Sequence, residues 1–308
     1  MHNIIVRDLL RVRLSQMLIN EKYKEGKFKI PIHLSFGHEA IAVALSHVLG
    51  KEDKLLLTHR NIAYNIARAN KLRPILDEYL LLKTGLAQGR LGSMNLMNVE
   101  GNIIYSSSIL ANNFSVAAGV AMGEKLKSNP SATFVLGGDG SMEEGSFYES
   151  LTMMNSLGLP VVVIIENNEW SLGTHISERR IHIDVEKMTS SLGINYVRLE
   201  GNDTCKYMDE LQSVRNLSLK DNKPICVEVI VKTLGDRRNP PSPEYPDGKY
   251  INYHAGPTHT VNLLQEKPGI ILRFDLYDPL FVTSEHVGLK TITELADIVL
   301  NELKNELL

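Results

Sequence analysis

The sequence predicts an α/β fold with a mostly parallel sheet and helices on both faces. Short apolar runs at 132–136 and 159–165 flank a segment at 145–157 with helical character, which is the strand–helix–strand unit of a parallel sheet. Two further apolar runs, at 196–200 and 225–232, flank another helical segment. The chain has 308 residues, 43% of them hydrophobic, so it can bury the large core that such a fold needs.

The other elements are predicted from apolar spacing and turn residues, taken along the chain. Residues 1–24 form an amphipathic helix in this interpretation, because Ile5, Leu9 and Val12 recur at near-helical spacing. Four prolines between 240 and 246 exclude a helix and indicate an extended, mobile loop. We also expect helical segments within 37–49, 53–69 (after a short strand), 74–84, 106–121, 188–192, 204–217 and 291–308, with a loop at 176–187.

Polar clusters directly follow two of the predicted strands. Gly138-Asp139-Gly140 comes after the run at 132–136, and Asn167-Asn168 comes after the run at 159–165. Both clusters therefore lie at the carboxyl ends of strands, where open α/β sheets bind ligands. Glycine allows a phosphate to approach the backbone, and carboxylate and amide oxygens suit Mg²⁺. The pattern indicates Mg²⁺ bridging a diphosphate; the alternative is a tight turn followed by an Asn-rich loop.

The order of these clusters resembles the thiamine diphosphate motif of a family that includes 2-oxo acid dehydrogenase E1 enzymes and transketolases. The intervening Glu144-Gly145 and Leu-Pro-Val at 159–161 are most similar to the E1 α-subunit. The resemblance implies a thiamine diphosphate-binding (PP-type) fold, with Mg²⁺ held by Asp139, Asn168 and the carbonyl of Trp170. The cofactor-binding residues that it implies in this stretch are Gly138, Asp139, Gly140, Ser141, Asn168 and Trp170.

Residues 30–69 carry a second resemblance to the E1 α-subunit. His33 matches a family histidine that lines the active-site channel, while His38 stands where the family usually has Gln. His59 and Arg60 match a family pair that holds the diphosphate, and the planar fork of arginine suits phosphate. Read alone, His33 would be a structural histidine and Arg60 a solvated charge. A family histidine two residues after the arginine is replaced here by Ile62, which removes one possible polar contact.

The loop before the predicted helix at 106–121 resembles a family loop whose backbone meets the aminopyrimidine ring of the cofactor. Ser108 and Leu110 occupy the matching positions, and a simple loop-to-helix junction is the alternative. The glycine-punctuated loop at 85–95 resembles a family loop as well, with Asn95 in place of a histidine.

The segment after the last strand resembles transketolases and deoxyxylulose phosphate synthases. Val-Lys-Thr at 231–233 and His-Ala-Gly-Pro at 254–257 carry this similarity. In those families a histidine at this place faces the diphosphate and the substrate, so the resemblance implies this position for His254. His33 and His254 are therefore the expected catalytic residues, in proton transfer or substrate orientation, and His254 is also expected at the cofactor.

The resemblance predicts a domain organisation and a partner. Residues 1–260 are expected to form the PP-type domain, and residues 261–308 a C-terminal extension with an amphipathic helix. In the family, a Glu on a separate pyrimidine-binding domain activates the cofactor, and the residues after 260 are too few for a second such domain. We therefore expect a β-type subunit that supplies this Glu, in an α₂β₂ assembly.

The expected function is cleavage of a C–C bond next to a carbonyl, as in 2-oxo acid decarboxylation by dehydrogenase E1 enzymes, with thiamine diphosphate and Mg²⁺ as cofactors. Two alternatives stay open. One is the N-terminal subunit of a split transketolase-like ketol transferase acting on a ketose. The other is a non-catalytic paralogue with a binding or structural role.

Composition and charge argue against nucleic acid and membranes as partners. The formal net charge of −3 gives no electrostatic basis for binding nucleic acid or an anionic membrane. No apolar run approaches the ~18 residues of a membrane-spanning helix, and charged residues interrupt the N-terminal apolar pattern, so no signal peptide is evident. Two cysteines are too few for a disulfide scaffold. We expect a cytoplasmic protein with a small-molecule substrate.

Overall fold

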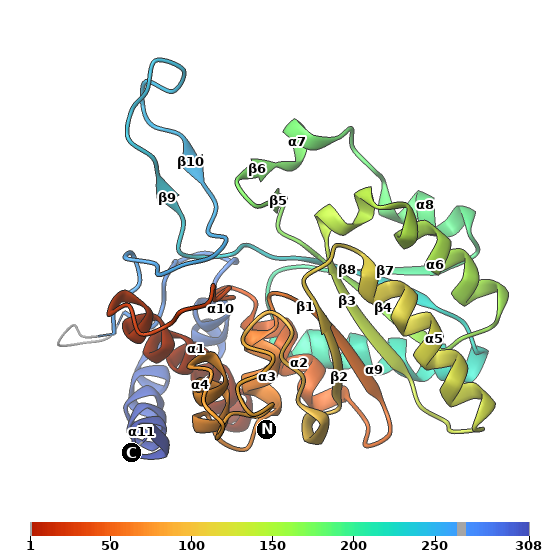
Figure 1. Cartoon of the computed structure of the whole chain (residues 1–308), viewed down its shortest axis with the longest axis horizontal. Coiled ribbons are helices and arrows are strands. Elements are labelled where there is room, and N and C mark those ends of the chain that lie inside the picture. The colour runs from red at the N-terminus through yellow and green to blue at the C-terminus, as the bar shows by residue number, and fades with distance from the viewer. Residues whose placement is uncertain (1, 264–268, 308) are drawn as a thin grey trace.

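A six-stranded parallel sheet forms the centre of the protein (Figure 1), in a computed structural model that describes residues 2–263 and 269–307. Neighbouring strands follow the order β2-β1-β3-β4-β8-β7, and their pairings are parallel. The predicted α/β fold with a mostly parallel sheet is confirmed. The strands are β1 (Lys54–Thr58), β2 (Ile103–Ser107), β3 (Thr133–Gly138), β4 (Val161–Asn167), β7 (Asn195–Leu199) and β8 (Ile225–Ile230).

Helices cover both faces of this sheet, as predicted. In β3, Phe134 and Leu136 pack into one core with helices α1, α2, α3 and α9, while Val135 packs into the other core with α5 and α6. Burial on both faces explains why the strands read as continuous apolar runs. The helices are α1 (His2–Lys24), α2 (Glu39–Val48), α3 (Ile62–Arg68), α4 (Arg73–Tyr79), α5 (Asn112–Leu126), α6 (Gly145–Ser156), α7 (Ile176–Arg179), α8 (Val185–Ser191), α9 (Thr204–Asp221), α10 (Pro279–Val287) and α11 (Leu289–Leu307).

The N-terminal and C-terminal helices lie against each other. The predicted C-terminal amphipathic helix is present as α11, which packs on α1 and on α10. Arg13 of α1 is fully buried and joins three segments: its Nε lies 2.5 Å from Glu39 of α2, and its Nη2 lies 3.0 Å from Asp278 at the start of α10. Of the helices within 2–263 and 269–307, none is long and apolar enough to span a membrane.

Three local features differ from the expectation, whereas the proline-rich segment at 240–246 contains no helix, as predicted. The loop expected at 176–187 is wrong in part, because α7 and the start of α8 lie there; His175 and Glu178 form a capping box that starts α7. The strand β2 and the helix α10 were missed. The proline-rich segment at 240–246 lies between two short antiparallel strands, β9 (Arg237–Arg238) and β10 (Tyr250–Ile251), in an arm that projects from the body (Figure 1).

Candidate functional site

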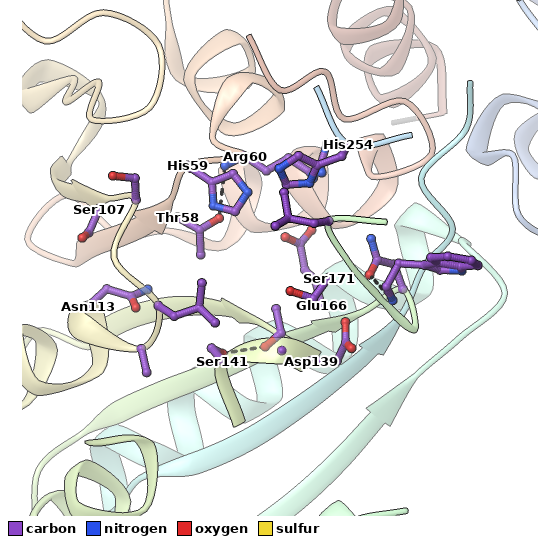
Figure 2. A pocket seen from close by; sticks show the side chains of 18 of the residues that line it. Thr58, His59, Arg60, Ser107, Asn113, Asp139, Ser141, Glu166, Ser171 and His254 are labelled. Carbon is purple, nitrogen blue, oxygen red and sulfur yellow. Dashed lines mark hydrogen bonds between the residues drawn. The ribbon is translucent and has the colours of Figure 1, made fainter. Parts of the chain in front are cut away.

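A cavity opens at the carboxyl ends of β1, β3 and β4, the edge at which the sequence places its polar clusters (Figure 2). Its walls come from the turns after β1, β2 and β3, from the segment after β4, and from the loop after β10. The structure brings together nearly all of the sequence-predicted site residues: His59, Arg60, Ser108, Leu110, Gly138, Asp139, Gly140, Ser141, Asn168, Trp170 and His254. His33 lies directly behind this wall, against the rings of His59 and His254.

The turn after β3 holds Asp139 in a buried position. One carboxylate oxygen, Oδ1, is buried and has no hydrogen-bond partner among the described residues. Burial raises the pKa of Asp139, and the neighbouring guanidinium of Arg179 opposes that rise. A buried carboxylate oxygen without a partner is costly. A cation at Oδ1 would remove this cost, so the donor chemistry fits a divalent metal ion.

Asn168, just after β4, faces the same cavity. Its side-chain oxygen accepts a hydrogen bond from the backbone N–H of Trp170 (3.0 Å), and its Nδ2 donates to Oγ1 of Thr233 (2.9 Å). Trp170 begins the short strand β5 (Trp170–Ser171), which pairs with β6 (Thr174–His175). The three expected metal ligands thus lie on two neighbouring segments at one edge of the sheet.

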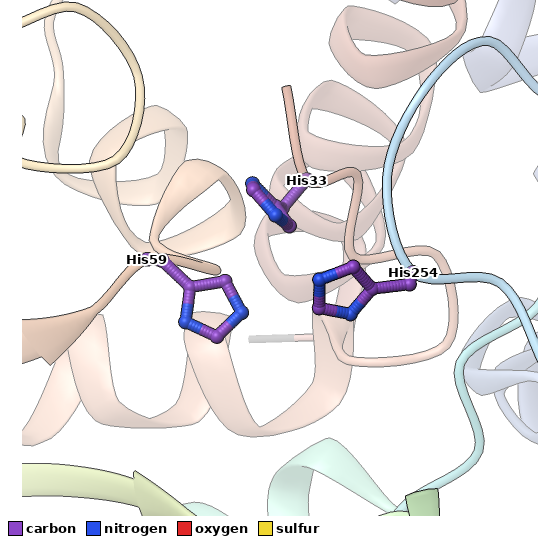
Figure 3. Close-up of side chains that lie close together, drawn as sticks. All are labelled: His33, His59 and His254. Atoms are coloured by element: carbon purple, nitrogen blue, oxygen red, sulfur yellow. The ribbon is translucent and has the colours of Figure 1, made fainter. Parts of the chain in front are cut away.

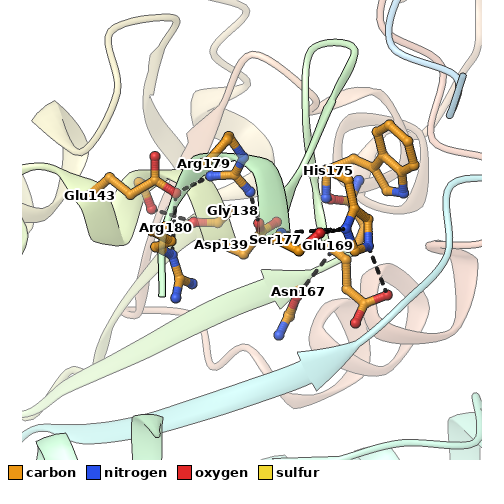
Figure 4. A network of polar contacts seen from close by, with 12 residues as sticks. Gly138, Asp139, Glu143, Asn167, Glu169, His175, Ser177, Arg179 and Arg180 are labelled. Carbon is orange, nitrogen blue, oxygen red and sulfur yellow. Dashed lines mark hydrogen bonds and ion pairs between the residues drawn. The ribbon is translucent and has the colours of Figure 1, made fainter. Parts of the chain in front are cut away.

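Arg179 was missed by the sequence analysis and lies directly on Asp139 (Figure 4). Its Nη2 is 2.5 Å from Oδ2 of Asp139, and its Nη1 pairs with Glu143. Arg180 also pairs with Glu143, at 3.2 Å. A guanidinium therefore neutralises one oxygen of Asp139 while the other oxygen stays free.

Glycines keep the turn after β3 compact. A Cβ on Gly137 would collide with the ring of Phe114. A Cβ on Gly140 would come within 3.0 Å of Oγ of Ser171 on β5. At this turn, Oγ of Ser141 donates to the carbonyl of Gly138 (2.5 Å). The packing explains the glycines at 137 and 140, and it brings β5 against the turn.

The rings of His59 and His254 form the opposite wall, and the ring of His33 packs against both of them (Figure 3). The ring centroid of His33 lies 4.6 Å from that of His59 and 4.8 Å from that of His254. Burial, assisted by the charge of Arg60, lowers the pKa of His33 to about 2, of His59 to about 3 and of His254 to about 4. All three imidazoles are therefore neutral at pH 7.

One ligand nitrogen from each of these histidines can lie within 4.8 Å of the other two, a spacing that could suit a metal ion. Arg60 opposes this use, because its buried guanidinium acts on all three rings with the same charge sign as a metal cation. Its Nη1 donates to the carbonyl of Leu34 (2.6 Å). The wall thus combines neutral imidazoles with one fixed positive charge, which suits an anionic or hydroxyl-bearing ligand.

Three positions depart from the E1 α-subunit pattern, namely Ile62, Asn95 and His38, and the structure shows where each of them lies. Ile62 starts α3 and is buried in the core, and Asn95 is exposed. His38 lines the cavity and lies 2.8 Å from the carboxylate of Glu166. His38 was expected only as a replacement of the usual Gln, and Glu166 was not predicted at the site, although it directly precedes the Asn pair.

Comparison with known sequences gives one family. The profile of the dehydrogenase E1 component family matches residues 8–235. The pyruvate dehydrogenase E1 component subunit alpha of Rickettsia bellii is 30% identical over 223 residues, which cover 72% of this chain and 68% of that protein. The mitochondrial protein of that name from Chaetomium thermophilum is 28% identical over 231 residues, 74% of this chain and 54% of that protein.

Comparison with solved structures gives the same fold. Transketolase from Campylobacter jejuni aligns with a TM-score of 0.60 and 15% identity, over 98% of this chain and 48% of that chain. A transketolase variant from Pichia stipitis aligns with a TM-score of 0.62 and 15% identity, over 98% and 46%. The chain therefore spans about half the length of these transketolases.

Proposed function

Because this chain belongs to the dehydrogenase E1 component family, as an α-type chain of the thiamine diphosphate-dependent 2-oxo acid dehydrogenases, we propose that it binds the diphosphate of that cofactor with Mg²⁺ and acts in decarboxylation of a small 2-oxo acid. The observation that carries the proposal is the meeting of Asp139, Asn168 and Trp170 at one edge of the sheet, opposite Arg60.

The proposed metal ligands are Oδ1 of Asp139, the side-chain oxygen of Asn168 and the carbonyl of Trp170. The unpartnered buried oxygen of Asp139 supports this assignment. Mg²⁺ takes few protein oxygens and completes its octahedron with phosphate and water, so three ligands suffice. Gly138, Gly140 and Ser141 would line the path of the diphosphate, while Ser108 and Leu110 would meet the aminopyrimidine end.

The proposed roles of the opposite wall follow from charge. Arg60 and His59 would hold the diphosphate, since Arg60 is a buried cation beside the cavity. A bound diphosphate would offset the charge of Arg60. The pKa of the neighbouring imidazoles would then rise toward the ordinary value of histidine. His33 and His254 could then hold and release a proton near the substrate.

When bound, thiamine diphosphate supplies the electron sink for cleavage of the bond next to the carbonyl. This chain contributes orientation, charge and proton-holding groups. Among the described residues that line the cavity, the carboxylates are Asp139, assigned to the cation, and Glu166, engaged by His38 and Tyr64. We therefore propose that the activating carboxylate comes from a β-type subunit, in an α₂β₂ assembly.

The test is calorimetric binding of thiamine diphosphate to the complex of this chain with its partner. Wild type should bind only with Mg²⁺ present, and Asp139→Ala should abolish binding because the anionic metal ligand is lost. Asp209→Ala, an exposed aspartate on α9, is the matched control and should bind as wild type does. Equal affinity for wild type and Asp139→Ala, or with and without EDTA, would contradict the proposal.

A transketolase-like ketol transfer is the second candidate. The neutral imidazoles of His59 and His254 in the cavity wall favour it, because each offers a donor and an acceptor to substrate hydroxyl groups. Turnover of a ketose donor, with no turnover of 2-oxo acids by the same complex, would select this candidate.

A further inference from the structure

A buried chain of hydrogen bonds connects Asn168 to the interior of the protein. Nδ2 of Asn168 donates to Oγ1 of Thr233 (2.9 Å), and Oγ1 also lies 2.9 Å from Nε2 of His38. Nδ1 of His38 lies 2.8 Å from Oε1 of Glu166, which also accepts a hydrogen bond from the hydroxyl of Tyr64 (2.8 Å). Apart from the half-buried Asn168, all these side chains are buried.

With a neutral imidazole at His38 and an ionised Glu166, the donors and acceptors of this chain fit a single arrangement. An amide nitrogen can only donate, so Thr233 accepts from Asn168 and its own hydroxyl proton points to Nε2 of His38. Nε2 is then the acceptor nitrogen, and the N–H at Nδ1 donates to Glu166. The carboxylate of Glu166 accepts from both His38 and Tyr64 at the end of the chain. Each proton therefore has one place.

The backbone holds Thr233 in position. The N–H of Leu234 donates to the carbonyl of Phe36 (2.8 Å), next to the segment that carries His38. Gly37 has a φ of +94°, and a Cβ there would collide with the carbonyl of Lys232. Thr233 thus lies on a segment that is fixed against the start of α2.

This arrangement decides which way the amide of Asn168 faces. With Nδ2 on Thr233, the side-chain oxygen accepts from the N–H of Trp170 and keeps its second lone pair for the proposed cation. A flipped amide would set Nδ2 against the N–H of Trp170, two donors in contact, and would remove the oxygen from the cation. The orientation of one amide therefore controls a metal ligand.

We propose that Thr233 and His38 are positioning residues that orient Asn168 as a metal ligand, with Glu166 and Tyr64 fixing the tautomer of His38. The inference rests on the proposed cation site. Residues that orient metal ligands commonly contribute 10–100-fold to metal affinity. The position where the family usually has Gln can serve the same purpose, because a Gln amide offers one donor for Glu166 and one acceptor for Thr233.

The test is the affinity of the full chain for Mn²⁺ in the presence of thiamine diphosphate, read from the electron paramagnetic resonance signal of free Mn²⁺. Thr233→Val should lower the affinity by about tenfold or more, and Thr233→Ser should stay near wild type. His38→Leu should weaken binding, and His38→Gln should restore it. Thr133→Val is the matched control, because Thr133 is equally buried and its hydroxyl has no hydrogen-bond partner among the described residues.

Asp139→Ala separates the two proposals. Wild-type Mn²⁺ affinity in Asp139→Ala would overturn the cation site itself. Loss of affinity in Asp139→Ala, with unchanged affinity in folded Thr233→Val and His38→Leu, would overturn the positioning role alone. Circular dichroism establishes folding of each variant. If His38→Leu does not fold, Thr233→Val decides the question, since it replaces only a hydroxyl by a methyl group.

Discussion

At the scale of single residues, the buried imidazoles link the cavity to the stability of the protein. His33 is only 6% exposed, and burial together with Arg60 lowers its pKa to about 2. In the unfolded chain a histidine takes up a proton as the pH falls through about 6.5. Below this pH the unfolded state therefore binds more protons than the folded state. The free energy of unfolding loses nothing to His33 above this pH, and it declines as the pH falls toward the folded-state pKa.

We predict that His33→Asn removes part of this pH dependence. Between pH 7 and pH 5, protonation of His33 in the unfolded chain should cost wild type about 2 kcal/mol of unfolding free energy. The variant lacks this contribution, so its stability should fall by about 2 kcal/mol less over the same interval. Urea unfolding at the two pH values measures the difference. An equal decline in wild type and variant would contradict the neutral, buried state of His33.

The individual site residues differ in how far the sequence could predict them. Asp139 and Asn168 directly follow apolar runs, so their place at strand ends could be read from local pattern. Arg179 could not be predicted as the partner of Asp139, because their contact depends on how β5, β6 and α7 fold back over the turn. The same holds for His38 and Glu166, which meet only when α2 packs at the end of β4.

At the scale of secondary-structure elements, Arg13 ties α1 to α2 and α10. Its guanidinium contacts Glu39 and Asp278, and all three side chains are fully buried. Removing one partner of a buried ion pair leaves uncompensated charge, which typically costs about 3–5 kcal/mol. We predict a loss of this size for Arg13→Met in the free energy of unfolding, measured by urea denaturation.

The matched control is Arg7→Met on the same helix. Arg7 pairs with Glu302 of α11 at 2.7 Å, and the two side chains are 40% and 48% exposed. Exposed pairs of this kind contribute at most about 1 kcal/mol. Similar losses in the two variants would show that burial of Arg13 is not what makes it important.

The elements themselves were predictable in proportion to their burial. Strands β3, β4 and β8 are apolar over most of their length because both of their faces are covered. In contrast, β2 lies at the edge of the sheet and is only partly buried, so its short sequence carries a weak signal. The helix α10 begins with Asp278 as N-cap and a proline at the first position, a local signal that was available and overlooked.

At the scale of the whole molecule, the mouth of the cavity exposes apolar side chains. Ile109 is 69% exposed, Leu110 45% and Leu172 64%, and all three line the cavity. Single exposed apolar residues are ordinary, but here they surround the site from which an activating carboxylate is missing among the described residues. This face is therefore where we expect the β-type subunit to bind.

We predict that the chain alone is inactive and that adding the β-type subunit restores turnover. Leu172→Asp should weaken that association by about tenfold or more, because it places a charge in an apolar contact. Leu126→Asp is the control: Leu126 is 76% exposed at the end of α5, outside the cavity lining, and its variant should associate as wild type does.

Thiamine diphosphate and Mg²⁺ should tighten the complex, since a ligand held between two chains stabilises their association. Titration of the β-type subunit, followed by sedimentation and activity, measures both effects. Full turnover by the isolated chain would show that the activating carboxylate lies within it, and equal association of both variants would place the partner on another face.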